Sequence, residues 1–204
     1  AGINVSPPDV SKLNQAFVEL FCHTVITNGT VEYLKQSIEK HQFDACTIND
    51  NLNLQSVVFD EGEDEFPTFT STISPHKNQM APFLFAVFKG RTEIVQFLLE
   101  HYKPNLEMEG ILILDEVQVQ GVTSLWMAVS FNYSELVLLL LRYGADINHG
   151  TSKSRSTPLR VACFDGNSDL VRLLIEQGAD VNMPNKFQNT CLMLACYMGF
   201  ENVV

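Results

Sequence analysis

The chain has 204 residues, of which 46% are apolar and 18% are charged, and its formal net charge is -11 at pH 7. This size allows one domain or two modest ones and argues against a large multi-domain enzyme, and the composition excludes a disordered or collagen-like chain. The acidic balance repels phosphate backbones and anionic lipid headgroups, so neither nucleic acid nor a membrane surface is an expected partner. The apolar stretches are all far shorter than the ~20 residues of a membrane-spanning helix.

The first part of the chain predicts a helix pair. Residues 11–26 and 30–40 carry a helical apolar pattern and are joined by Asn28 and Gly29. Their pattern is weaker than that of later segments. Because the terminal units of a repeat protein are atypical, residues 1–41 are predicted to form a degenerate N-terminal capping repeat.

Residues 42–79 lose the helical periodicity and contain the run DEGEDEFPTFTSTISP. Acidic, hydroxyl and proline residues in this density are typical of a flexible connection, so the sequence predicts a flexible acidic and Ser/Thr-rich insertion. A regulatory acidic tract is the alternative interpretation, and a solvated loop is favoured over it.

Residues 80–204 contain an internal repeat. Four segments align without a gap, and their shared column holds Ala86, Ala128, Ala162 and Ala195, which are 42, 34 and 33 residues apart. The last two steps match the ankyrin period of about 33 residues. The sequence therefore predicts an all-α ankyrin-repeat solenoid of stacked helix pairs with β-hairpin fingers, whose last repeat is truncated. The chain is expected to continue beyond Val204.

Capping residues mark the ends of the predicted helices. Thr157 is placed to cap a short helix that begins at Pro158, where the missing N–H costs nothing. Ser134 and Ser168 are the predicted caps of the longer helices. The short helices are predicted to end at residues that tolerate a left-handed backbone, namely Gly90, Asn132, Gly166 and Gly199.

The first step of the repeat exceeds the ankyrin period by about nine residues, which lie in KPNLEMEGILILDEVQVQG. Residues 111–114 and 117–120 have strand character and flank Asp115 and Glu116, and Gly110 and Gly121 bracket them. This pattern predicts one lengthened β-hairpin finger. A longer finger would form a wall beside the short helices and so create a groove.

The repeat columns indicate which side chains line that groove. Leu125, Leu159 and Leu192 occupy the core positions of the short helices, whereas Trp126, Arg160, Phe164 and Asp165 fall at helix edges or ends. Trp126 is either an amphipathic anchor for a ligand or a core residue, and the sequence favours neither.

Enzyme chemistry finds no support in the sequence. It contains no Gly-rich phosphate loop, no HExxH pair and no GxSxG elbow, so no catalytic residue and no cofactor are predicted. The five histidines are scattered and predict no metal site. The five cysteines form an odd set without CxxC spacing, which is typical of reduced thiols in the cytoplasm or the nucleus.

The repeats also carry a specific resemblance. The strings STPLRVACFDG, NTCLMLACYMG and SLWMAV, together with the long finger ending at Gly121, resemble the Fem family of feminization-protein homologs. Members of this family act as substrate receptors of cullin-RING ubiquitin ligases. The resemblance covers residues 81–204 well, and the first 80 residues match only as a degenerate start.

The resemblance implies recognition of a C-terminal degron, a short peptide tail that commonly ends in Arg. The family's pocket acids then fall on Asp115 at the finger tip and on Asp165, where two carboxylates would clamp a guanidinium by charge-assisted hydrogen bonds. Ser156 with Arg160 or Arg155 would receive the terminal carboxylate of the tail.

Two positions depart from the family pattern, and both acids have ordinary alternatives. Leu114 stands where the family has an aromatic residue, and Arg155 replaces a small polar residue near the predicted pocket, where its charge would partly neutralise the acids. Asp165 is otherwise a helix-end residue, and Asp115 belongs to a common hairpin turn.

The predicted function is therefore non-catalytic. The chain is interpreted as the substrate-recognition domain of an E3 ligase receptor in the ubiquitin conjugation pathway, which binds C-terminal, basic peptide tails through Asp115, Asp165, Trp126, Phe164, Ser156 and Arg160. The cullin-binding element of the family lies outside this segment. The alternative function is a generic ankyrin scaffold or inhibitor that grips a folded partner on its concave face.

Overall fold

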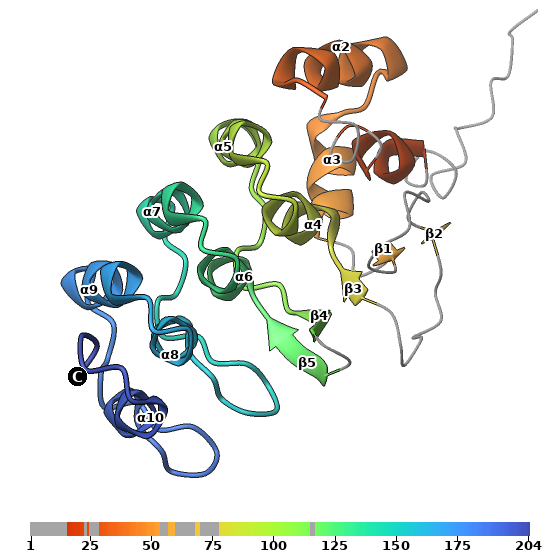
Figure 1. The fold of residues 1–204 in the computed structure, drawn as a ribbon. Helices are drawn as coiled ribbons and strands as arrows, with labels where there is room; N and C mark the ends of the chain where they lie inside the picture. Colours follow the sequence, from red (N-terminus) through yellow and green to blue (C-terminus); the bar gives the residue numbers. More distant parts are fainter. Residues whose placement is uncertain are drawn as a thin grey trace, which may run out of the picture.

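The computed structural model describes residues 16–22, 24, 29–53, 57–59, 68–69, 78–114 and 117–204. Helix pairs follow one another along the chain and stack side by side, with the shorter helices in one row and the longer helices in a second row (Figure 1). This is the mostly helical stack of repeats that the sequence predicts. No helix in this part of the chain is both long and apolar enough to cross a membrane.

The elements follow the repeat in chain order. Residues 16–22 are helical, and the next helices are α2 (Val31–His41) and α3 (Ala45–Leu52). The repeats then contribute α4 (Pro82–Phe88) with α5 (Thr92–His101), α6 (Ser124–Ser130) with α7 (Ser134–Arg142), α8 (Pro158–Phe164) with α9 (Ser168–Glu176), and α10 (Cys191–Met198). The strands are β1 (Val57–Phe59), β2 (Thr68–Phe69), β3 (Asn78–Met80), β4 (Gly110–Leu114) and β5 (Val117–Val122).

The short helices pack closely because each presents an alanine to its neighbours. Ala86, Ala128, Ala162 and Ala195 are at most 1% exposed. Helix α6 packs against both α4 and α8, and α8 packs against α10. A larger side chain in this column would force the helices apart, because protein cores have few voids that could take it.

The predicted helix ends are confirmed in most positions. Thr157 precedes α8, and its hydroxyl accepts a hydrogen bond from the backbone N–H of Arg160, while Pro158 opens the helix. The short helices end at residues with positive φ, as expected from a left-handed C-terminal residue. These residues are Gly90, Asn132, Gly166 and Gly199, with φ between 57° and 76°.

The predicted caps of the longer helices are wrong by one residue. Ser134 and Ser168 are the first helical residues of α7 and α9, and Tyr133 and Asn167 hold the capping positions. The side chain of Asn167 accepts a hydrogen bond from the backbone N–H of Leu170. The turn before each helix is one residue shorter than the sequence pattern indicates, which moves the serine inside the helix.

The predicted core position Leu192 also differs from its equivalents. Leu125 and Leu159 are 1% and 2% exposed, whereas Leu192 on α10 is 55% exposed. Helix α8 covers one side of α10, and no helix pair of the described residues packs on its other side. The apolar face of α10 is therefore open.

The five strands form one antiparallel sheet in the order β2-β1-β3-β4-β5. Strands β4 and β5 form the lengthened hairpin finger that the sequence predicts, in register from Ile111 opposite Gln120 to Leu114 opposite Val117. A register shift between Gly110 and Ile111 separates this ladder from the base of the finger. The finger is thus the outer part of a larger sheet that projects beyond the row of short helices (Figure 1).

The first part of the predicted insertion is ordered as a helix, which corrects the expectation for residues 45–52. Asp44 caps α3 by accepting a hydrogen bond from the backbone N–H of Thr47 at 2.7 Å, and Ile48 and Leu52 are buried. The sequence signal is weak because only these two apolar residues mark the helix face. Residues 54–56, 60–67 and 70–77 lie outside the described residues. The domain boundaries at 41 and 79 stay a prediction.

Candidate functional site

The finger and the short helices create the surface on which the predicted site residues lie. Helices α6 and α8 stand beside the sheet, and the loop between α7 and α8 runs along the finger (Figure 1). Gly121 in β5 has a φ of +80°, and a Cβ at this position would collide with the side chain of Ser152 in that loop. Only glycine allows the finger and the loop to approach so closely.

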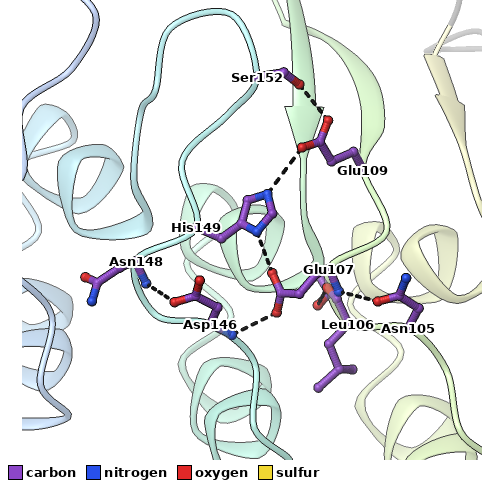
Figure 2. Close-up of polar contacts among 9 residues, drawn as sticks. Asn105, Leu106, Glu107, Glu109, Asp146, Asn148, His149 and Ser152 are labelled. Atoms are coloured by element: carbon purple, nitrogen blue, oxygen red, sulfur yellow. Dashed lines mark hydrogen bonds and ion pairs between the residues drawn. The ribbon is translucent and has the colours of Figure 1, made fainter.

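A polar network joins the base of the finger to the same loop. His149 lies between two glutamates, with Nδ1 3.0 Å from Glu107 Oε2 and Nε2 3.3 Å from Glu109 Oε1 (Figure 2). Ser152 donates a hydrogen bond from Oγ to Glu109 Oε2 at 2.6 Å. The Ser152 hydrogen bond, with a further contribution from His149, lowers the pKa of Glu109. The imidazole of His149 therefore lies between the loop and the base of the finger, with each ring nitrogen next to one glutamate carboxylate.

The same region carries a ladder of side-chain to backbone hydrogen bonds between successive repeats. Asn53 Oδ1 accepts from the N–H of Asn105 at 2.7 Å, and Glu107 Oε1 accepts from the N–H of Asp146 at 2.8 Å. In the next repeat Asn148 Oδ1 accepts from the N–H of Asp180 at 2.9 Å. Each rung satisfies a loop amide, so the loops that carry the fingers are fixed relative to one another.

Asp165 is the predicted pocket acid that the structure describes. It is the C-cap residue of α8, it lies at the surface, and its neighbours remove enough water to raise the pKa of its carboxyl. Its carboxylate forms no ion pair with any other described residue. An anion is unfavourable at the C-terminal end of a helix, where the last carbonyl groups concentrate negative charge. A cation bound next to Asp165 would therefore stabilise its ionised carboxylate.

Asp115, the second predicted acid, lies with Glu116 outside the described residues. The strands on both sides of it are in register, with Leu114 opposite Val117. The approach of Asp115 to Asp165 thus stays a prediction.

The two predicted aromatic contacts differ in their exposure. Phe164, next to Asp165, is 55% exposed, as a ligand contact must be. Trp126 on α6 is only 5% exposed and belongs to the hydrophobic core, so its ring fills the core in this structure. Its indole Nε1 is nevertheless buried without a hydrogen-bond partner among the described residues. Such a donor costs free energy unless a partner reaches it.

The residues expected to receive a carboxylate already have structural contacts. The guanidinium of Arg160 donates from Nη1 to the carbonyl oxygens of Asn189 at 3.0 Å and Thr190 at 3.3 Å, which ties α8 to the start of the next repeat. Ser156 is half-buried, and its backbone N–H donates to Thr151 Oγ1 at 3.1 Å. Arg155 is exposed in a left-handed turn with a φ of 54°. Ser156 and Arg160 are therefore held in place, although their side chains keep further donors that no described residue accepts from.

Two cysteines lie together below this surface. Cys163 of α8 and Cys191 of α10 are buried, and they share a side-chain hydrogen bond. This hydrogen bond and burial raise the pKa of Cys163 and leave it a poor nucleophile, whereas the same bond lowers the pKa of Cys191. Both thiols are free, and both fill space between successive short helices.

Comparison with known proteins identifies the repeat. Residues 14–151 and 125–204 match the family described as ankyrin repeats (3 copies).

The chain is an ankyrin-repeat protein.

Three relatives illustrate the range of similar proteins. The sex-determining protein fem-1 of Caenorhabditis elegans is 39% identical over 117 residues, which are 57% of this chain and 18% of that protein. Protein fem-1 homolog CG6966 of Drosophila melanogaster is 34% identical over 115 residues, which are 56% of this chain and 17% of that protein. Protein phosphatase 1 regulatory subunit 27 of Mus musculus is 43% identical over 75 residues, which are 33% of this chain and 48% of that protein. The chain thus spans less than a fifth of the two fem-1 proteins.

These similarities define the function at a coarse level. Ankyrin repeats are protein–protein interaction modules, so this chain is a protein-interaction domain with moderate similarity to fem-1 over about half its length. An ankyrin domain is typically non-catalytic, and its partners are proteins.

Sequence reasoning missed the network around His149. In the sequence His149 is one of five scattered histidines, and no motif marks Glu107 or Glu109 as a functional residue. The gap-free repeat columns did contain a signal, because Glu107 lies 42 residues before His149 and so occupies the same column one repeat earlier. Residues in equivalent columns of adjacent ankyrin repeats stack on one another, so two acids in the NLEMEG segment were placed to meet the INHGTS segment.

Proposed function

We propose that this ankyrin chain is the degron-binding part of a substrate receptor for a cullin-RING ubiquitin ligase, and that it captures C-terminal, basic peptide tails of substrate proteins. The similarity to two fem-1 proteins supports the receptor role, because the Fem resemblance implies degron binding. The cullin would be recruited by parts of the receptor outside this segment.

One observation carries the peptide chemistry. Asp165 holds a carboxylate at the C-terminal end of a helix, with a raised pKa and no cationic partner among the described residues. The exposed ring of Phe164 lies next to it in sequence. An Arg side chain forms paired hydrogen bonds with a carboxylate and stacks on an aromatic ring, so each of these two exposed residues suits an Arg-ended tail.

Peptide titration tests the proposal. A fluorescent ten-residue peptide ending in Arg should bind the chain, and amidation of its terminal carboxylate should abolish binding. Asp165→Asn should weaken the free-acid peptide at least tenfold, which is about 1.4 kcal/mol, because the guanidinium loses its charged partner. Glu176→Gln is the matched control, because it also removes one negative charge, at the C-terminal end of the next helix, α9. It should leave the affinity for the peptide unchanged. Equal affinity of Asp165→Asn and the parent chain would refute the assigned role of Asp165.

The scaffold alternative has one observation in its favour. Arg160 already donates to two backbone carbonyl groups, and it therefore serves the stacking of repeats. A scaffold that grips a folded partner would bind the free-acid and amidated peptides equally weakly. Indifference to amidation would favour this alternative over the receptor.

A further inference from the structure

The outer edge of the finger offers unpaired backbone groups, and the register of the sheet identifies them. The backbone N–H of Ile113 in β4 donates to Asn78 Oδ1 in β3 at 2.7 Å. Strand β3 lies on the side of β4 away from β5, so Ile113 directs its amide away from β5. Facing pairs in an antiparallel ladder alternate between hydrogen-bonded and non-hydrogen-bonded pairs. Gln118 faces Ile113, so its own N–H and C=O point to the outer side of β5. Gln120, two residues further along, points the same way.

Among the described residues, no further strand pairs with this outer side of β5. Strand β5 ends the sheet, and no turn or loop of the described residues makes a backbone hydrogen bond to Gln118 or Gln120. Ser152 covers the edge only at Gly121, near the base of the finger, while Val117 toward the tip is 63% exposed. The strand VQVQGV contains no charged residue and no proline. Charged residues and proline usually protect a free strand edge from pairing, so an edge without them can accept another strand.

A cavity opens beside the same edge. It has a volume of about 300 Å³ and is lined by Gln79, Glu109, Gly110, Ile111, Gln120, Gly121 and Ser152. Glu109 is its charged lining residue, and the hydrogen bond from Ser152 keeps that carboxylate ionised at neutral pH. Lys153 and Arg155 on the adjacent loop do not line it. A side chain that enters this cavity meets amides, a hydroxyl and one negative charge.

We propose that the outer edge of β5 binds an extended segment of a partner protein as an added β-strand, paired at Gln118 and Gln120, with a Lys or Arg side chain of that segment in the cavity at Glu109. Strand addition is a common mode of peptide recognition, in which the backbone gives affinity and alternate side chains give specificity. The basic residue matches both Glu109 and the net charge of -11. The inference goes beyond the proposed function, because an added strand needs no free terminal carboxylate.

The length of the finger explains why the edge is free. The next finger is short, since Thr151 and Ser156 already pair with each other, and it reaches β5 through Ser152 at Gly121. The extra residues of the long finger thus extend β5 past the part that its neighbour covers. An incoming strand would lie about 4.8 Å from β5, the usual spacing of paired strands, which brings its side chains over the cavity lined by Gln120.

The test uses a peptide without a free terminus. The probe is the acetylated and amidated octapeptide SVTVKVTS, with a second version in which Leu replaces Lys. We expect the Lys peptide to bind and to slow hydrogen exchange of the Gln118 and Gln120 amides at least tenfold. Gln118→Pro should weaken binding at least tenfold, because proline removes the outward N–H without removing a bond to β4. Gln118→Thr retains the amide and should bind like the parent chain.

A second variant tests the cavity. Glu109→Gln should weaken the Lys peptide at least fivefold and leave the Leu peptide unchanged, so that the preference for Lys disappears. Matching thermal melts of Gln118→Pro and Gln118→Thr would show that both variants fold.

Three results would overturn the proposal. These are equal affinity of Gln118→Pro and Gln118→Thr, unchanged exchange at Gln118 and Gln120, and absence of binding at about 1 mM peptide. Sedimentation that shows a dimer broken by Gln118→Pro would assign the edge to a second copy of the chain and would also overturn it. Because the probe has no free carboxylate, its failure leaves the degron proposal unaffected, and failure of the Arg-ended peptide leaves this one unaffected.

Discussion

The placement of Asp165 predicts that removing its charge stabilises the fold. The pKa of Asp165 is raised, so folding disfavours its ionised form relative to the unfolded chain. The stability linked to this group is therefore full at low pH and is lost as pH rises through the folded pKa. Asp165→Asn mimics the protonated form. At pH 7 the variant should therefore be more stable than the parent chain.

The size of this effect follows from the position of the group. A charge of the wrong sign at the end of a helix costs about 0.3–1 kcal/mol, and solvent screens a side chain at the surface, so the gain should be about 0.5 kcal/mol. For a chain of this length such a change raises the melting temperature by about 1–2 °C. A substitution of Asp by Asn also changes helix-end preferences, but that contribution does not depend on pH.

Urea unfolding of both chains at several pH values separates the two contributions. The difference in unfolding free energy between the variant and the parent should be positive at pH 7 and should shrink toward its pH-independent part as the Asp165 carboxyl protonates. A variant that is less stable than the parent at pH 7, by an amount that disappears in acid, would mean that the carboxylate has a favourable partner in the folded chain. Such a result would refute the prediction that the charge of Asp165 destabilises the folded chain.

Two further predictions concern the base of the finger. The pKa of Glu109 is lowered, so Glu109→Gln should destabilise the chain near neutral pH. This loss of stability should fade as pH falls through the folded pKa of Glu109. A loss that stays constant in acid would exclude the hydrogen bond from Ser152 as its cause. Gly121→Ala should lower the unfolding free energy by about 1–3 kcal/mol, because a Cβ at a φ of +80° is strained and meets Ser152. Ser152→Gly should recover only the part of the Gly121→Ala loss that comes from the Ser152 side chain, because the close approach of the Ser152 backbone N and the backbone strain at residue 121 both remain. Calorimetric melts of the parent, the two single variants and the double variant would contradict this if the two losses simply add.

The repeat itself could be predicted from sequence because its signal is local and recurs. The Thr157-Pro158 start of α8 and the glycines after the short helices depend on local backbone rules, and the alanine column depends on a close helix contact that recurs in every repeat. The finger was predictable for the same reason, since Gly110 and Gly121 bracket two segments with strand character.

The misplaced elements depend instead on tertiary packing. Helix α3 has only Ile48 and Leu52 as buried apolar residues on a polar segment, and its packing against α4 rather than its composition stabilises it. The caps of α7 and α9 moved by one residue because the tight turn fixes where each helix begins. Sequence patterns locate helix ends only to within a residue or two.

The candidate site was the least predictable part. The position of Asp165 at a helix end followed from the repeat, but the absence of a cation beside it depends on side chains from other repeats. Trp126 was left open between anchor and core, and only the packed structure places its ring in the core. The His149 network joins residues about 40 positions apart, so it becomes visible only when adjacent repeats are superimposed in register.

The three hydrogen bonds that join successive loops differ in the charge of the side chain that accepts them. Asn53 and Asn148 supply neutral amide oxygens to the next loop, whereas Glu107 supplies a carboxylate that also contacts His149. Dissolved ions weaken attraction between charged groups and hardly affect a neutral hydrogen bond. When His149 carries a proton, added salt therefore weakens the joint between the α4–α5 pair and the α6–α7 pair, whereas the neutral hydrogen bonds of Asn53 and Asn148 at the other two joints are hardly affected.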